Sequence, residues 1–90
     1  MLQTVSIVVK GKVHGVHYRQ SVREKCTALG ITGSVRNLAD GTVQIAATGT
    51  KAQIDDLLRW CKEGPPRAVV TAVEWKEELL VIFEEFRVIR

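Results

Sequence analysis

The 90-residue sequence lacks the features that define membrane, disulfide-rich and zinc-binding proteins. Its longest apolar run, Leu79 to Phe83, is far shorter than the ~20 apolar residues that cross a bilayer. The N-terminus has no charged segment before an apolar stretch and does not resemble a secretory signal, so we expect a cytoplasmic protein without membrane association. The two cysteines, Cys26 and Cys61, lack the short spacing of a zinc site. Both fall on apolar faces of predicted helices, where we expect buried thiols.

The net positive charge is small, and aromatic residues are few. The formal net charge of +3 suits an anionic ligand but falls short of the dense basic stripe of a nucleic-acid-binding domain. The chain has two tryptophans, two phenylalanines and one tyrosine, and none of them lies in the predicted strand "TVQIAATG", Thr42 to Gly49. RNA-recognition domains stack bases on aromatic side chains of their central strands. We therefore expect no nucleic-acid partner.

The length and the hydrophobic pattern predict one domain, residues 1–90, with the element order β-α-β-β-α-β and a short extra C-terminal strand. This order is typical of a ferredoxin-like α+β sandwich, an antiparallel sheet with both helices on one face. The tail from Leu79 to Phe86 would also fit a helix, but we favour a strand at "FRVI". Strands are predicted at 4–13, 33–39, around Val43–Ala47, at 69–76 and at 86–89. Ser21 and Glu24 have the spacing of a capping box for the first helix, with a helix start one turn earlier as the alternative, and Thr50 and Gln53 give a capping box for the second. The helices are predicted to end at Gly30 and Gly64.

The loop "KVHGVHYRQS", Lys12 to Ser21, lies between the first strand and the first helix. A loop feeding a helix N-terminus can aim several backbone N–H groups at one anion, and Arg19 adds a planar fork that matches phosphate oxygens. The loop is not the common nucleotide loop, since only three residues separate Gly11 from Gly15, where that motif has four, and no Gly-Lys-Ser/Thr follows. The residues leave two readings open: a phosphate cradle, or an exposed loop with a solvated Arg19.

The topology predicts which residue meets this loop. Two strands joined through a helix run parallel, so the first two strands end at the same edge of the sheet. Asn37 lies near the end of the second strand and shares its face with Val35. We therefore expect the Asn37 side chain to lean toward the start of the first helix.

Two sequence blocks resemble the acylphosphatase family. "GKVHGVHYR", Gly11 to Arg19, is similar to the family signature Gly-x-Val-Gln-Gly-Val-x-Phe-Arg. "GSVRNLADGTVQI", Gly33 to Ile45, is similar to a second family block, Gly-x-Val-x-Asn-x-x-Asp-Gly-x-Val-Glu. The segments "GPP", Gly64 to Pro66, and "FRVI", Phe86 to Ile89, are also similar to the corresponding segments of family members. The chain departs from the pattern with histidine at 14 in place of glutamine, tyrosine at 18 in place of phenylalanine and glutamine at 44 in place of glutamate. None of these changes affects the residues that match the catalytic pair.

The resemblance implies a metal-independent enzyme without a cofactor, which hydrolyses small acyl phosphates to a carboxylate and inorganic phosphate. Arg19 would hold the phosphoryl group and Asn37 would orient the attacking water. The remaining substrate contacts would come from the amides of the loop, which comprises His14, Gly15, Val16, His17 and Tyr18. We expect a monomer.

Three alternatives compete with this interpretation. His14 and His17 have an H-x-x-H spacing that could bind zinc with Cys26 or Asp40, but a catalytic zinc usually has three protein ligands and no third is adjacent in sequence. An RNA-binding module is disfavoured by the scarce aromatic residues. A small-ligand regulatory domain, or the acylphosphatase-like domain at the front of larger carbamoyl-transfer proteins, would share the fold.

Overall fold

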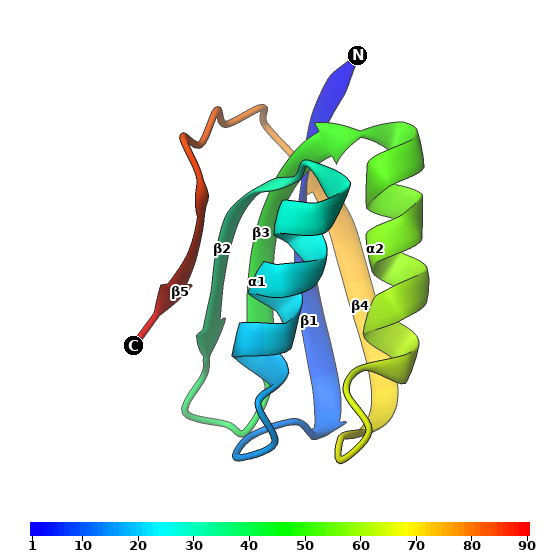
Figure 1. Ribbon diagram of the computed structural model, residues 1–90, viewed down its shortest axis with the longest axis vertical. Helices are drawn as coiled ribbons and strands as arrows, with labels where there is room; N and C mark the ends of the chain where they lie inside the picture. Colours follow the sequence, from blue (N-terminus) through cyan, green and yellow to red (C-terminus); the bar gives the residue numbers. More distant parts are fainter.

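The computed structural model describes residues 1–90 and contains a five-stranded sheet with two helices on one face (Figure 1). The strands lie in the order β4-β1-β3-β2-β5 across the sheet. This arrangement confirms the predicted element order, the ferredoxin-like fold and the strand at the C-terminus. The elements are β1 (Leu2–Lys12), α1 (Tyr18–Leu29), β2 (Thr32–Asn37), β3 (Val43–Thr50), α2 (Lys51–Glu63), β4 (Val69–Glu78) and β5 (Phe86–Ile89).

The sheet is antiparallel except at its last strand. β3 is antiparallel to both β1 and β2, and β4 is antiparallel to β1, whereas β5 pairs with β2 in parallel. The cause is the connection 79–85, which crosses the sheet at the end where β4 finishes and where β2 begins (Figure 1). β5 therefore starts beside the start of β2 and runs in the same direction, which makes the sheet mixed.

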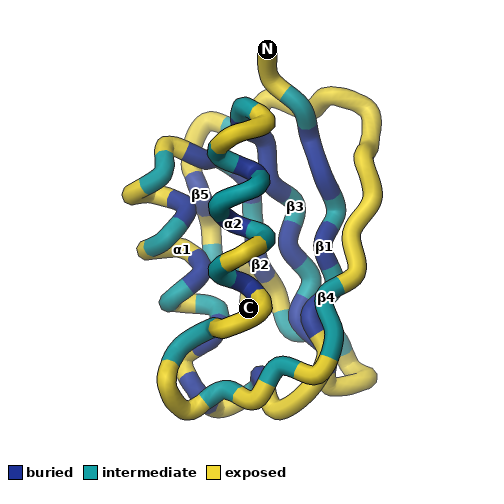
Figure 2. The backbone as a smooth tube through the Cα atoms, turned by 90° about the vertical axis from the view of Figure 1, so that its right-hand side faces the viewer, coloured by how far each residue is buried: buried dark blue, intermediate teal, exposed yellow.

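The core lies between the sheet and the two helices (Figure 2). Alternate residues of β1, namely Val5, Ile7 and Val9, are fully buried on this side because successive side chains of a strand point to opposite faces. The helices contribute one apolar stripe each, including Cys26 from α1 and Cys61 from α2. Both thiols are free and buried, as predicted, and burial raises the pKa of Cys61 to about 12.

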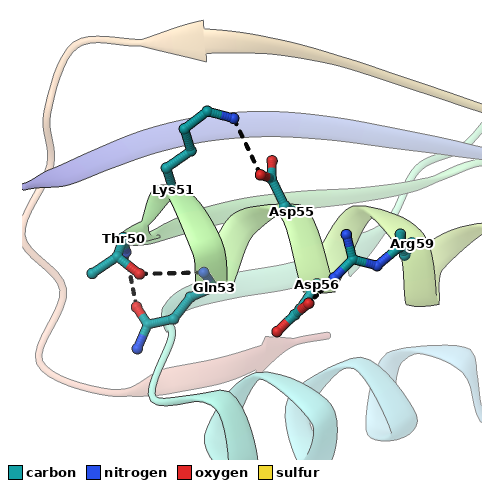
Figure 3. A network of polar contacts seen from close by, with 6 residues as sticks. All are labelled: Thr50, Lys51, Gln53, Asp55, Asp56 and Arg59. Carbon is teal, nitrogen blue, oxygen red and sulfur yellow. Dashed lines mark hydrogen bonds and ion pairs between the residues drawn. The ribbon is translucent and has the colours of Figure 1, made fainter.

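The two helix starts differ in how they follow the sequence signals. The predicted Thr50/Gln53 capping box is confirmed at α2, where the Thr50 side chain accepts from the Gln53 amide at 3.2 Å and the Gln53 side chain accepts from the Thr50 amide at 2.8 Å (Figure 3). The predicted Ser21/Glu24 box is wrong. α1 begins a turn earlier at Tyr18, and Ser21 lies inside the helix with its amide donating to the His17 carbonyl.

Candidate active site

The segment from Val13 to His17 makes a tight turn between β1 and α1. Gly15 has φ 69° and His17 has φ 61°, and His17 is the only non-glycine residue of the chain with a positive φ. A left-handed conformation at a residue other than glycine is strained by about 1–3 kcal/mol, and such residues cluster at functional sites. The strain at His17 therefore marks this turn as a position where backbone direction matters.

Backbone amides of the turn are left without partners. None of the N–H groups of residues 14 to 17 donates to a backbone carbonyl, and the N-cap residue His17 makes no capping hydrogen bond with its side chain. The first amides of a helix also lack intrahelical acceptors, and the helix dipole adds partial positive charge at that end. The turn and the start of α1 together form a concentration of free N–H donors suited to an anion.

Arg19 occupies the second position of α1 and lies beside these amides. Its Nη1 donates to the carbonyl of Ile89 in β5 at 3.2 Å. A guanidinium carries five N–H donors, so this contact fixes the side chain while leaving most of its donors free. The parallel docking of β5 against β2 thus helps to orient the cation.

Asn37 ends β2, and its Oδ1 is the only buried side-chain nitrogen or oxygen in the chain without a hydrogen-bond partner. Such unsatisfied atoms are rare in folded proteins, because each costs the desolvation energy of a polar group. The side chain faces the same cavity as Arg19, which is the position predicted from its parity with Val35. The Asn37 Oδ1 is therefore an acceptor that no protein group uses, on a residue that lines the cavity.

One cavity of about 520 Å³ brings these groups together. Five of the seven predicted site residues line it: Gly15, His17, Tyr18, Arg19 and Asn37. The structure places the other two differently. Val16 is buried in the core, and the His14 ring, which is not part of the cavity lining, contacts the Thr42 carbonyl in the turn between β2 and β3.

Tyr18 contributes to the site chiefly through its backbone. Its hydroxyl donates to the Cys61 carbonyl at 2.9 Å inside the core, and burial raises the pKa of this phenol above its ordinary value. The side chain therefore anchors the start of α1 to the end of α2. This anchoring holds the helix N-terminus at the cavity.

Besides Val13 and Gln20, which flank the predicted residues in sequence, sequence reasoning missed Arg90 and Val88, which also line the cavity. Both residues follow from the parallel pairing of β5 with β2, because that pairing brings the chain end beside Asn37. The predicted strand "FRVI" was the available signal, but its direction depends on the path of the 79–85 connection. Arg90 adds a second cationic side chain to the cavity wall.

The residues around the cavity do not resemble a metal centre. The chain holds no group of three or more His, Cys, Asp or Glu side chains that could bind a metal ion. His17 lines the cavity, whereas His14 contacts the Thr42 carbonyl, so the two histidines do not share one site.

No helix of the chain is long and apolar enough to span a bilayer.

Comparison with known proteins agrees with this geometry. The family model "Acylphosphatase" matches residues 5–88. The chain belongs to the acylphosphatase family. It is 44% identical over 90 residues to an acylphosphatase of Methylococcus capsulatus, covering 99% of this chain and 98% of that protein, and 48% identical over 83 residues to one of Acaryochloris marina, covering 92% and 89%.

Solved acylphosphatases have the same fold. The structure of an acylphosphatase from Coxiella burnetii matches with a TM-score of 0.94 at 41% identity, covering 97% of this chain and 92% of that one. Full-length HypF matches with a TM-score of 0.89 at 22% identity and over only 12% of its own length, which shows the shared fold alone. The family, the fold and the hydrolase activity expected from the two sequence blocks are confirmed: the chain is an acylphosphatase, an enzyme acting on small acyl phosphates.

Proposed function

We propose that this acylphosphatase binds the phosphoryl group of its substrate between Arg19 and the free amides of residues 14–18, and that Asn37 orients the attacking water. The proposal is supported by two observations: Arg19 and Asn37 line the same cavity, and the Asn37 Oδ1 is an acceptor without a protein partner. The turn amides complete the anion site, because they have no carbonyl partners of their own.

The cradle supplies what phosphoryl transfer mainly requires. The transferred group carries its charge on three equatorial oxygens, and catalysis consists largely of positioning and electrostatic stabilisation. Arg19 can donate to two of these oxygens through its fork, while preorganised amides take the others. Because Ile89 already holds the guanidinium, little side-chain freedom is lost when the substrate binds.

Asn37 acts as a positioning acceptor and not as a base, since its amide does not titrate. Its Oδ1 accepts a hydrogen bond from the water, which turns an oxygen lone pair toward phosphorus. A new bond forms between the water oxygen and phosphorus, and the bond between phosphorus and the acyl oxygen breaks. The electron pair leaves with the carboxylate, a phosphoryl oxygen takes one proton of the water, and the other proton stays on the attacking oxygen.

The leaving group explains why so few side chains suffice. A carboxylate is stable at neutral pH, since its conjugate acid has a pKa of about 4. Its departure needs no general acid. The scheme also requires no metal ion, cofactor or phosphorylated enzyme.

We further propose that the chain works in the cytoplasm as a single-domain monomer. Sedimentation at increasing protein concentration would test the monomeric state.

Hydrolysis of benzoyl phosphate in ¹⁸O-labelled water tests the reaction path. Attack on phosphorus predicts that the label enters inorganic phosphate, that phosphate inhibits competitively, and that EDTA leaves the rate unchanged. Label in benzoate would show attack on the carbonyl carbon instead. Loss of activity in EDTA that an added divalent metal restores would contradict the metal-independent scheme.

A further inference from the structure

His14 contacts the turn that follows the Asn37 strand. Its Nε2 lies 2.8 Å from the carbonyl oxygen of Thr42, across 28 residues of sequence, in a partly buried position. A carbonyl oxygen can only accept, so this nitrogen carries a hydrogen and donates it. The side chain thus connects the first residue of the cradle to the start of β3.

The acceptor belongs to a rigid turn. The Thr42 carbonyl also accepts from the Leu38 amide at 2.9 Å, and Leu38 directly follows Asn37. The carboxylate of Asp40 accepts from the Thr42 amide at 3.1 Å and from the Thr42 hydroxyl at 2.6 Å. These bonds lower the pKa of Asp40, the hydroxyl contact being the largest cause, so the carboxylate is ionised and holds the turn at neutral pH.

Asn37 is itself fixed on the same turn, because it pairs with Val43, the residue after Thr42. The contacts therefore form a short path from the cradle residue His14, through the Thr42 carbonyl, to the strand end that carries Asn37. No other side-chain hydrogen bond joins residues 13–17 to the β2–β3 hairpin.

We propose that His14 is a positioning residue that fixes the distance between the phosphate cradle and Asn37. The proposal rests on the roles assigned above to the cradle and to Asn37. The family signature usually has glutamine at this position, and a glutamine amide can donate the same hydrogen bond. A displacement of about 1 Å between reacting groups can cost about 10²-fold in rate, whereas the cradle and Arg19 remain able to bind phosphate.

Three variants test the coupling with benzoyl phosphate as substrate and inorganic phosphate as inhibitor. His14→Ala should lower kcat by about 10- to 100-fold and change the phosphate inhibition constant by less than about threefold. His14→Gln should restore kcat to within about threefold of the parent, because it retains a donor. Arg36→Ala is the matched control: it removes the exposed contact of Arg36 with Gln44 on the same hairpin, neither residue lines the cavity, and kcat should stay unchanged.

A double-mutant cycle with Asn37→Ala separates positioning from mere support of the fold. If His14 acts through Asn37, adding His14→Ala to Asn37→Ala should lower kcat by less than about threefold. Multiplicative effects of the two changes would overturn the proposal, as would an unchanged kcat in His14→Ala, failure of His14→Gln to restore it, or an equal loss of phosphate affinity. A parental kcat in Asn37→Ala would overturn the role of Asn37 in the proposed function, and the His14 proposal with it.

Discussion

At the scale of single residues, the proposed phosphate site depends on one guanidinium that is oriented before the substrate arrives. Arg19 is fixed at its base by α1 and at its tip by the Ile89 carbonyl, so its free N–H groups point in a defined direction. A lysine at this position would present a hydrated point charge on a flexible stem. Such a charge cannot donate to two phosphoryl oxygens in parallel.

Arg19→Lys should therefore lower kcat/KM by about 10²–10³-fold, as expected for the loss of about 2.7–4 kcal/mol of preorganised stabilisation. Steady-state hydrolysis of benzoyl phosphate measures the loss, and weaker inhibition by inorganic phosphate should accompany it. Arg23→Lys is the matched control one turn further along α1, where the side chain is exposed and lies outside the cavity. A lysine variant at position 19 with parental phosphate inhibition would remove Arg19 from the cradle.

Residue positions were predictable from sequence where topology alone decides them. Arg19 and Asn37 were placed together because parallel strands end at one edge and because residues two apart in a strand share a face. The direction of the His14 ring was not predictable in this way. It depends on how the β2–β3 turn folds back to present the Thr42 carbonyl, a contact that no local pattern encodes.

At the scale of secondary structure, α1 shows why a sequence signal failed. Ser21 and Glu24 have the spacing of a capping box, but the helix begins at Tyr18 with no side-chain cap. A capping side chain would occupy the amides that the proposed anion site needs. The left-handed backbone at His17 replaces the cap as the device that starts the helix, and such a conformation leaves no clear trace in the sequence.

β2 depends on a glycine for its approach to β3. Gly33 has φ 150°, and a Cβ atom added there would lie 1.8 Å from the Ala46 carbonyl oxygen. Gly33→Ala should lower the free energy of unfolding by about 2–4 kcal/mol, combining backbone strain with overpacking. Urea denaturation measures this loss through the transition midpoint at constant slope.

Gly41→Ala is the control for Gly33→Ala. Gly41 also has a positive φ, 91°, but nothing lies within 4 Å of an added Cβ atom. This variant should show only the backbone strain, about 1–2 kcal/mol. Equal losses in the two variants would show that the close approach to Ala46 does not limit the packing of β2.

At the scale of the whole molecule, the core buries groups that must stay neutral. Burial raises the pKa of Cys61 from 9.0 to about 12 and raises the pKa values of Cys26 and Tyr18 above their ordinary ranges. Above pH 9 the unfolded chain releases the thiol protons, whereas the folded chain retains them. The unfolded state then binds fewer protons, so stability falls as pH rises.

Below pH 9 the two thiols should not change the free energy of unfolding as pH varies. Above pH 9 each thiol should lower the free energy of unfolding by about 1.4 kcal/mol per pH unit. Urea denaturation at pH 8 and pH 10 checks this slope. The variant with both Cys26→Ala and Cys61→Ala should be less stable at pH 8 but should lose less on going to pH 10. An identical pH dependence with and without the thiols would show that their burial does not control alkaline unfolding.

The layered architecture was fully predictable from hydrophobic periodicity, because each strand and helix has one apolar face. The parallel direction of β5 was not predictable from this periodicity, since it follows from where the 79–85 connection crosses the sheet (Figure 1). That direction matters for the proposed site, because β5 supplies the carbonyl that accepts from Arg19 and brings Arg90 to the cavity.

The division of labour between the cradle and Asn37 is tested most directly by Asn37→Ala, measured as kcat on benzoyl phosphate together with the dissociation constant of inorganic phosphate from calorimetry. A residue that only steers water should lower kcat by about 10²–10³-fold when it is removed, while phosphate binding changes by less than about threefold. A parental kcat, or a loss of phosphate affinity as large as the loss of kcat, would contradict the account.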